Sequence, residues 1–396
     1  MNNREIETYI SDISGSTKYR KGITVEHRSG NPKRDYLFVN KYQCKHLPSS
    51  PTKMFNMCLQ LIKKCDNIKD NDRVLIIGFA ETATAISKIM SKNMSQCKKL
   101  VNTTRENIEL SSKIVEFKEE HSHAVEQYLL AMYNSDIDHE LSKIDYILFV
   151  DDEITTGKTI LNCINVLKNK YNITQRIGVA SICNWQSDDD ISKFNEIGID
   201  RYYLVSGKIR DTSQKIENCE LCSNKEHDEE FNKIVYIDSL YNYNSGSFLR
   251  ERVLTSGNAE LDYIISDIAN DILERQLKDT ASDRLIRVIG SEECMYPAIM
   301  VGKLLEQAGF NVVCHSTTRS KIDVMCGHTI ETIYKRNKVA SAYDIDRNTY
   351  IYNLSDNATL NVIISDTQSV ECFNNFVQSI ANVVDNGKSR IIAYNI

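Results

Sequence analysis

Residues Tyr146–Thr159 read Tyr-Ile-Leu-Phe-Val-Asp-Asp-Glu-Ile-Thr-Thr-Gly-Lys-Thr, and this stretch decides the fold class. Its apolar start, Tyr146 to Val150, is too short for a helix and rich in β-formers, which predicts a buried strand. After the turn, four apolar residues recur at helical spacing: Ile160, Cys163, Ile164 and Leu167. A buried strand that leads into an amphipathic helix predicts an α/β protein with a mainly parallel sheet.

The turn between this strand and helix carries the chemistry. Asp151 and Asp152 follow the strand, and five further residues form the turn: Thr155, Thr156, Gly157, Lys158 and Thr159. Hydroxyl groups and a glycine at a helix N-terminus suit a bound phosphate, because the backbone N–H groups there attract anions. Two carboxylates in front of such a turn suit vicinal hydroxyls or a divalent cation, and a merely polar surface turn is the alternative.

This arrangement resembles the PRPP-binding motif of type I phosphoribosyltransferases. The resemblance implies that Asp151 and Asp152 hold the ribose hydroxyls and contact Mg²⁺, and that Thr155–Thr159 hold the 5′-phosphate. Gly157-Lys158-Thr159 also looks like the end of a Walker A loop. That motif needs a glycine five positions before Gly157, where the chain has Asp152.

Two polar turns lie upstream of this motif. Val74–Ile77 predicts a strand, and the turn after it contains Gly78, Ala80, Glu81 and Thr82. The resemblance implies that this turn is the pyrophosphate loop. Arg105 follows Thr103-Thr104 at the end of a second apolar run, where a guanidinium can bind a phosphate with two hydrogen bonds. A solvated surface arginine is the alternative.

A third segment, between Arg105 and the central strand, is rich in acids and histidines: Glu119, Glu120, His121 and His123. Such groups can move protons or help to seat a metal-bound pyrophosphate. Type I phosphoribosyltransferases have a mobile catalytic loop in this part of the chain, and the resemblance therefore implies that these four residues are catalytic. The alternative is a solvated helix start.

Length and composition bound the remaining possibilities. At 396 residues the chain should hold about two domains. A net charge of −6 and a pI near 5.8 argue against a nucleic-acid-binding surface. No apolar run is long enough for a membrane span and the N-terminus shows no signal-peptide pattern, so we expect a cytoplasmic protein without membrane contact. The 12 cysteines are expected to be free thiols. Cys219 and Cys222 form half of a zinc site at most.

The second half of the chain repeats features of the first. Gly290 precedes Thr317 by 27 residues, much as Gly78 precedes Thr103 by 25. We therefore expect a second α/β domain that is a degenerate repeat of the first. Its candidate pocket residues are Glu292, Glu293, Thr317, Thr318, Arg319 and Asp366. The predicted domains are 1–207 and 231–396, joined by a polar linker at 208–230, and residues 1–30 are expected to be an irregular lead-in.

These features together resemble two-domain bacterial proteins that join an orotate-type phosphoribosyltransferase domain to a TRSP domain, encoded with tellurium-resistance and stress genes. The matching stretches are short and distributed over most of the chain: 38–48, 78–84, 103–105, 119–124, 151–159, 290–297 and 316–320. The name-giving motif departs from the family, since Lys321 stands where a proline is expected.

The resemblance implies Mg²⁺-dependent transfer of phosphoribosyl between PRPP and a nitrogenous acceptor, in the biosynthesis of a nucleoside-like metabolite. Thr155 stands where purine-salvage enzymes of this fold usually carry an aspartate, which favours an orotate-like or unusual acceptor. The main alternative is a non-catalytic PRPP or nucleotide sensor, and a metal or tellurite binder is a weaker one. A homodimer is compatible with the sequence, which does not fix the oligomeric state.

Overall fold

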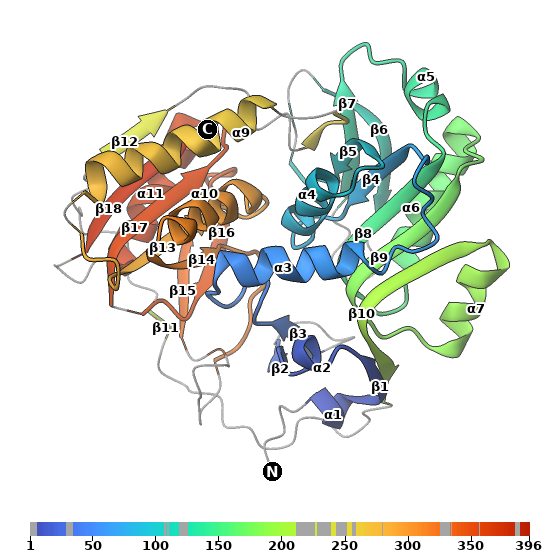
Figure 1. Cartoon of the computed structure of the whole chain (residues 1–396), viewed down its shortest axis with the longest axis horizontal. Helices are drawn as coiled ribbons and strands as arrows, with labels where there is room; N and C mark the ends of the chain where they lie inside the picture. The colour runs from blue at the N-terminus through green and yellow to red at the C-terminus, as the bar shows by residue number, and fades with distance from the viewer. Residues whose placement is uncertain are drawn as a thin grey trace. The chain divides into compact units, whose positions relative to one another are not determined.

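The structure is a computed structural model of the whole chain. It describes residues 6–28, 35–106, 108, 111–118, 126–210, 226–227, 239–242, 252–255, 259–278, 280–324, 333, 335–355, 357–384 and 389–396. Within these ranges the chain forms two compact α/β units, each with its own mostly parallel sheet (Figure 1). The α/β class expected from the sequence is therefore confirmed.

The two units are interleaved along the chain. The first unit comprises Met1–Lys21, Asn56–Lys215 and Leu249–Asn258, and the second comprises Gly22–Phe55, Ile216–Phe248 and Ala259–Ile396. The division falls within helix α3 (Pro51–Ile62). The division into domains 1–207 and 231–396 remains a prediction, because the two compact units do not by themselves show which segments fold independently. The stretch 22–55, which they place in the first domain, packs with the second unit.

The first unit is built around β8 (Tyr146–Ile154). Its other strands are β1 (Ile10–Gly15), β4 (Val74–Gly78), β5 (Cys97–Asn102), β6 (Ser111–Lys118), β7 (Glu126–Met132), β9 (Arg176–Asn184) and β10 (Ile199–Ile209). Its helices are α1 (Ile6–Tyr9), α2 (Thr17–Arg20), α4 (Thr84–Asn93), α5 (Ile137–Ser142), α6 (Lys158–Tyr171) and α7 (Asp188–Glu196).

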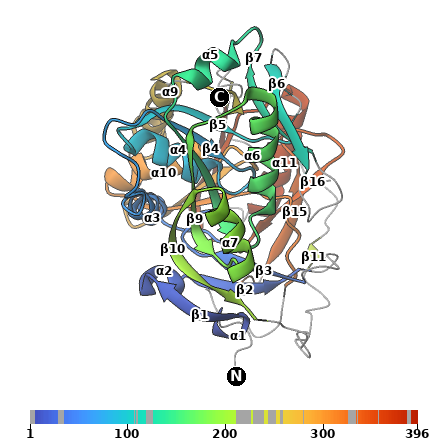
Figure 2. The ribbon, with the colours of Figure 1, turned by 90° about the vertical axis from the view of Figure 1, so that its right-hand side faces the viewer.

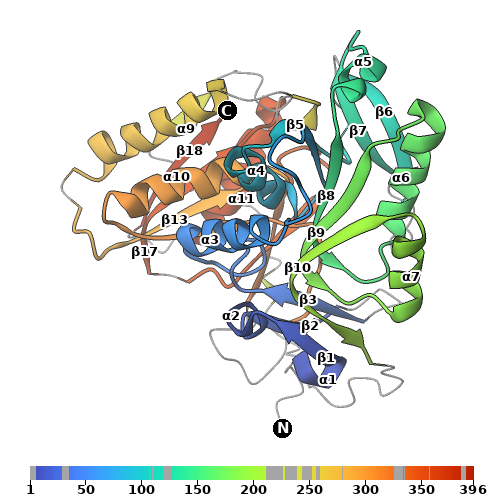
Figure 3. The ribbon, with the colours of Figure 1, turned by 45° about the vertical axis from the view of Figure 1, so that its right-hand side comes forward.

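Six strands of this unit form one sheet in the order β1-β10-β9-β8-β4-β5, parallel except for β1. Helix α4 covers one face, and α6 and α7 cover the other (Figure 3). The central strand is apolar throughout its first five residues because both faces are covered, and Tyr146 to Val150 are fully buried. The stripe predicted on α6 is confirmed, since Ile160, Cys163, Ile164 and Leu167 all join the core.

The second unit has an equivalent sheet. Its strands are β2 (Ile23–His27), β3 (Tyr36–Asn40), β11 (Glu226–His227), β12 (Ser239–Asn242), β13 (Leu285–Gly290), β14 (Asn311–Ser316), β15 (Arg336–Ala340), β16 (Asn348–Tyr352), β17 (Ala358–Ser365) and β18 (Arg390–Asn395). Its helices are α9 (Ala259–Asp271), continued by the π-helix η1 (Ile272–Gln276), α10 (Tyr296–Gln307) and α11 (Val370–Val384).

The parallel sheet of this unit runs β12-β18-β17-β13-β14. Helix α10 lies on one face and α11 on the other (Figure 2). The side chains of α11 pack on β17 and β18 in a core that includes Phe373, Phe376, Ile363 and Ile391. A smaller core joins Val39 and Leu47 of the early segment to Ile322 and Tyr352, which explains why residues 22–55 belong to this unit.

The two sheets share one connectivity over four parallel strands, β4, β5, β8 and β9 in the first and β13, β14, β17 and β18 in the second. In each, the first parallel strand (β4 or β13) lies between the second (β5 or β14) and the third (β8 or β17), and an antiparallel pair (β6–β7 or β15–β16) intervenes in the chain. The turns after the first strands also match. The N–H of Ala80 donates to Thr103 Oγ1 over 2.8 Å, and the N–H of Glu292 donates to Thr317 Oγ1 over 2.9 Å. This agreement supports the predicted repeat.

Two predictions about local structure were wrong. Residues 6–28, the described part of the expected irregular lead-in 1–30, contain regular structure, because β1 pairs antiparallel with β10 and makes the edge of the first sheet. The predicted strand end at Val150 is too early, because β8 continues through Ile154 alongside β9, and Asp151 lies opposite Ser181. Both errors arise from pairing with strands elsewhere in the chain, which local residue preference does not report.

No helix in the described ranges is long and apolar enough to span a bilayer. The nine cysteines within those ranges are free thiols, as predicted, and eight of them are buried.

Candidate active site

The carboxyl ends of β5, β4, β8 and β9 bring the predicted turns of the first unit to one edge of the sheet. Gly78 lies opposite Asn102 of β5 on one side and Val150 of β8 on the other. Because these strands are parallel, the residues that follow them share that edge. The structure therefore brings together the Gly78 turn, Arg105, Asp151–Asp152 and the turn at 155–159.

Asp151 and Asp152 occupy the end of β8 and are both half-buried. The N–H of Asp152 donates to Asp151 Oδ1 over 2.9 Å, which fixes the first carboxylate against its own backbone. The neighbouring Cys183 thiol is buried, and this burial, followed by the charges of Glu153 and Asp152, raises its pKa well above the ordinary value. The thiol therefore stays protonated and adds no negative charge beside the two acids.

The stretch 155–159 leads into α6 as the sequence predicts, and the helix begins at Lys158, so Lys158 and Thr159 belong to its first turn. Gly157 is the N-cap residue and has φ +75°, a left-handed conformation that favours glycine. A Cβ atom at this position would lie 2.4 Å from Cζ of Phe194, a fully buried ring of α7. Two independent features therefore favour glycine at position 157: the left-handed backbone conformation and the close approach of the Phe194 ring. Thr155, Thr156 and Thr159 are half-buried and Lys158 is exposed.

A buried amide pair that the sequence analysis did not select supports this turn. Gln186 Nε2 donates to the carbonyl oxygen of Thr156 over 3.4 Å. The backbone N–H of Gln186 in turn donates to Asn184 Oδ1 over 3.0 Å, and Asn184 Nδ2 donates to Gln186 Oε1 over 3.2 Å. Asn184 is the last residue of β9 and Gln186 lies two positions later, so polar residues at the next strand end were the signal that could have identified them.

The turn after β4 is held by a closed ring of hydrogen bonds. Thr103 Oγ1 accepts the Ala80 N–H and donates to Gln127 Oε1 over 2.6 Å, and Gln127 Nε2 reaches the Ala80 carbonyl over 3.5 Å. Gln127 of β7 is a second residue that the sequence analysis missed. The ring leaves the backbone from Gly78 to Thr82 as a fixed loop, and the peptide bond between Ala80 and Glu81 is cis.

Gly78 is needed for close packing below this loop. A Cβ atom there would lie 2.3 Å from both the Asn102 amide oxygen and the Ser87 hydroxyl oxygen, which are themselves hydrogen-bonded over 2.6 Å. Glu81 is buried, Thr82 is half-buried, and Arg105 is half-buried at the end of the adjacent strand. The predicted catalytic residues Glu119, Glu120, His121 and His123 lie outside the described residues, between β6 and β7.

The described residues supply too few ligands to hold Mg²⁺ alone, but they can hold it together with a substrate phosphate. Among the described residues, no group of three or more histidine, cysteine or acidic side chains is arranged to hold a metal ion. Mg²⁺ commonly uses one or two carboxylates together with substrate phosphate oxygens and water. Asp151 and Asp152 can supply those carboxylates. Cys219 and Cys222, the candidate zinc pair, lie outside the described residues.

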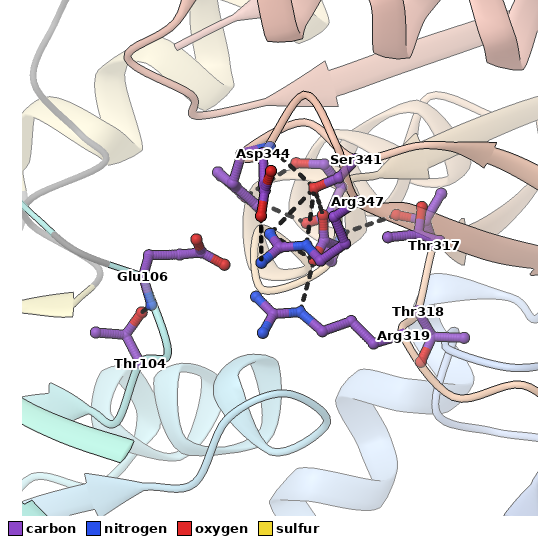
Figure 4. A network of polar contacts seen from close by, with 12 residues as sticks. Thr104, Glu106, Thr317, Thr318, Arg319, Ser341, Asp344 and Arg347 are labelled. Atoms are coloured by element: carbon purple, nitrogen blue, oxygen red, sulfur yellow. Dashed lines mark hydrogen bonds and ion pairs between the residues drawn. The ribbon is translucent and has the colours of Figure 1, made fainter. Parts of the chain in front are cut away.

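The second unit has a polar network at the equivalent strand ends (Figure 4). Glu292 lies in the turn after β13 with φ +32°, and its side chain is 0 % exposed. Its carboxylate accepts from Arg319 Nε over 2.8 Å and from the Ser341 hydroxyl over 2.5 Å, and it forms an ion pair with Arg347 Nη2 over 3.2 Å. Two guanidinium groups compensate a carboxylate that has lost its hydration.

The other predicted residues of this unit lie near the same edge. Thr317 caps the Glu292 N–H, Thr318 pairs with Tyr350 of β16, and Glu293 is buried beside Glu292. Asp366 follows β17 and is fully buried, with the Tyr343 hydroxyl donating to Oδ1 over 2.5 Å. This contrasts with Asp151 and Asp152, which are partly open to solvent. Lys45 is buried and donates to the Glu292 carbonyl over 2.7 Å.

Residues 24–207 match the family described as phosphoribosyl transferase, and residues 250–380 match the TRSP domain that lies C-terminal to it. No curated protein matches the sequence.

Similar solved structures include adenine phosphoribosyltransferases. The Trypanosoma brucei enzyme, in complex with AMP, pyrophosphate and ribose-5-phosphate, is 14 % identical with a TM-score of 0.36, over 55 % of this chain and 87 % of that one. The Giardia lamblia enzyme, complexed with 9-deazaadenine, is 10 % identical with a TM-score of 0.35, over 48 % and 97 %. The Rhodothermus marinus enzyme is 9 % identical with a TM-score of 0.34, over 47 % and 96 %.

Proposed function

We propose that the chain, a phosphoribosyltransferase with a TRSP domain after it, transfers phosphoribosyl between PRPP and a nitrogenous acceptor with Mg²⁺ as cofactor. One observation carries this proposal. The Gly78 turn, Arg105, the paired acids and the Thr155–Thr159 turn lie at the ends of adjacent parallel strands. Together these groups can bind the three parts of PRPP: the diphosphate, the ribose hydroxyls and the 5′-phosphate.

In the proposed complex, the turn at the N-terminus of α6 binds the 5′-phosphate. Its hydroxyl groups and helix N–H groups favour an anion, and Gly157 lets the backbone approach closely. Asp151 and Asp152 accept hydrogen bonds from the ribose 2′- and 3′-hydroxyls. The turn from Gly78 to Thr82 and Arg105 bind the diphosphate, with Mg²⁺ contributing charge neutralisation there when bound.

The reaction breaks the bond between C1′ and the diphosphate oxygen and forms a bond between C1′ and a nitrogen of the acceptor, which loses a proton. Positive charge develops at the ribose ring in an oxocarbenium-like transition state, as in glycoside chemistry. The carboxylates of Asp151 and Asp152 are placed to stabilise that charge electrostatically. Glu119, Glu120, His121 and His123, in the segment between β6 and β7, are proposed as the proton-handling groups.

The acceptor is proposed to be orotate-like or an unusual heterocycle. Thr155 offers a hydroxyl at a position where purine-salvage enzymes usually carry an aspartate, and a neutral side chain there does not favour the ring nitrogen of a purine. Membership of the orotate-type branch associated with bacterial tellurium-resistance genes is part of the same proposal, as are a cytoplasmic location and a homodimer.

The deciding experiment is an acceptor screen with labelled PRPP and Mg²⁺, in which diphosphate release is followed. We expect release with at least one pyrimidine or related heterocycle, and less with adenine. PRPP binding without release for any acceptor would contradict the proposed enzyme and favour a sensor.

For the second unit we propose a separate ligand site at the edge defined by Glu292, Glu293, Thr317, Thr318 and Arg319. Asp366 is sealed by Tyr343, so it does not serve there as the ribose-binding acid. Arg319→Ala should leave PRPP-dependent diphosphate release unchanged, because the first unit contains all the residues proposed for that step. Loss of diphosphate release in a folded Arg319→Ala protein would overturn this separation of roles.

A further inference from the structure

The first unit contains a cavity that the proposed reaction does not use. It has a volume of about 290 Å³ and is lined by residues of α4 from Lys88 onward and by the first four residues of β5. Its lining consists of Lys88, Ser91, Lys92, Met94, Cys97, Lys98, Lys99, Leu100 and Thr255. All of these residues belong to the first unit, since Thr255 pairs with Leu100 along the edge of the sheet.

The cavity lies at the opposite end of the sheet from the PRPP-binding residues. Cys97, where β5 begins, is opposite Val74, where β4 begins, whereas the Gly78 turn follows the last residue of β4. Ser91 and Lys92 likewise lie in the last turn of α4, and Lys88 lies in its middle, one turn beyond the start at Thr84. A ligand in this cavity would therefore be separate from PRPP.

The lining is strongly basic in a chain whose net charge is −6. Four of its residues are lysines, and none of the lining residues, all of which the structure describes, is acidic. Glu140, which lies outside the lining, contacts Lys99, and this hydrogen bond is the main reason why the pKa of Glu140 is lowered. Lys88 is 2 % exposed, and a positive charge in such a setting attracts an anion more strongly than one in open solvent.

The remaining lining groups favour an organic ligand with an apolar or sugar-like part over an inorganic ion. Met94 and Leu100 are buried apolar side chains, while Ser91 and Thr255 offer hydroxyl groups. Cys97 adds no opposing charge, because burial raises the pKa of its thiol to about 11 despite the nearby lysines. At about 290 Å³ the cavity is near the lower end of the range of roughly 300–1,000 Å³ for small-molecule pockets, which suits one sugar phosphate or mononucleotide.

We propose that this lysine-lined cavity binds a small organic phosphate, no larger than a mononucleotide, as a second ligand distinct from PRPP. The phosphate contacts the lysine ammonium groups, with Lys92 and Lys98 at the solvent-exposed rim, and the body of the ligand packs on Met94 and Leu100.

Calorimetry with AMP as the probe tests this inference in the full chain. The background is Asp151→Asn with Asp152→Asn, which weakens nucleotide binding at the proposed active site. We expect AMP to bind in this background, and adenosine, which lacks the phosphate, to bind at least tenfold more weakly. Adding Lys92→Ala and Lys98→Ala should weaken AMP binding by about 10- to 100-fold, because each lost charge-assisted contact is worth up to about tenfold.

The matched control is Lys63→Ala with Lys64→Ala, which removes the same charge from exposed positions outside the cavity and should leave AMP affinity unchanged. Lys92 and Lys98 are exposed, so their replacement should not unfold the chain, and a Lys92→Gln, Lys98→Gln protein provides a second test. An absence of AMP binding, or equal AMP affinity in the Lys92/Lys98 and Lys63/Lys64 proteins, would overturn the proposal. Both results concern AMP binding at the cavity only, so they would leave the proposed phosphoribosyl transfer, measured by diphosphate release, untouched.

Discussion

Replacing Gly157 by alanine tests the structure of the proposed phosphate turn. Gly157 has φ +75°, and for a residue with a Cβ atom this left-handed conformation costs about 1–2 kcal/mol. The new Cβ would also lie 2.4 Å and 2.7 Å from two atoms of the Phe194 ring. Because Phe194 is fully buried, the ring has little room to move, and such overpacking costs about 1–3 kcal/mol. Gly157→Ala should therefore destabilise the first unit by about 2–5 kcal/mol.

The chain provides both a probe and a control for this measurement. Trp185 is the single tryptophan, is buried in the first unit and precedes Gln186, so its fluorescence reports urea unfolding there. Gly198 has φ +69° in the same unit, but a Cβ atom there would have no neighbour within 4 Å. Gly198→Ala should therefore show only the conformational cost of about 1–2 kcal/mol. If both variants shift the urea midpoint equally at unchanged slope, the close contact between Gly157 and Phe194 is refuted.

Three further changes test other parts of the account. Gln186→Glu keeps the side-chain shape but removes the N–H donor to Thr156, so the KM for PRPP should rise about 3- to 10-fold with little change in kcat. An unchanged KM would show that Gln186 does not support the turn. Thr103→Val removes the hydroxyl that joins Ala80 to Gln127 and should cost about 2–4 kcal/mol by Trp185 fluorescence, whereas Thr103→Ser should cost much less. Burial, and then the charge of Arg287, lower the pKa of His315 to about 3, so as the pH falls below the ordinary value of 6.5 the unfolded chain gains a proton that the folded chain does not. The free energy of unfolding of the second unit should therefore fall by about 2 kcal/mol between pH 7 and pH 5. In urea titrations followed by circular dichroism, His315→Phe should remove that part of the pH dependence.

The central motif could be predicted because its signals are local. Five apolar residues, two acids, a glycine turn and a helical stripe follow one another within Tyr146–Leu167, and each segment's conformation depends mainly on its neighbours in sequence. The second sheet could be anticipated from the similar spacing of Gly78 to Thr103 and of Gly290 to Thr317. In both units this spacing reflects one strand, one helix and the next strand.

The parts that sequence reasoning missed depend on contacts between distant segments. Gln127 supports Ala80 from β7, and Phe194 fixes Gly157 from α7, 37 positions along the chain. Neither residue belongs to a motif, so only the folded arrangement identifies its role. Likewise, β1 is a polar edge strand whose hydrogen-bond partners lie in β10, almost two hundred residues later. The burial of Asp366 by Tyr343 also could not be read from an acid at a strand end.

The most direct test of the central claim is calorimetric titration of PRPP with Mg²⁺ into wild type and into the Asp151→Asn, Asp152→Asn double variant. The two adjacent acids are proposed to hold the ribose, and removing their like charges should leave the fold intact, with thermal stability equal to or above that of wild type. We expect the tightest PRPP site of wild type to be the one at Asp151 and Asp152, because the equivalent acid of the second unit is sealed. In the folded double variant we expect a loss of PRPP affinity of about 100-fold or more, the sum of two strong hydrogen-bonded contacts. Unchanged PRPP affinity in that variant would contradict the assignment of this edge of the sheet as the active site.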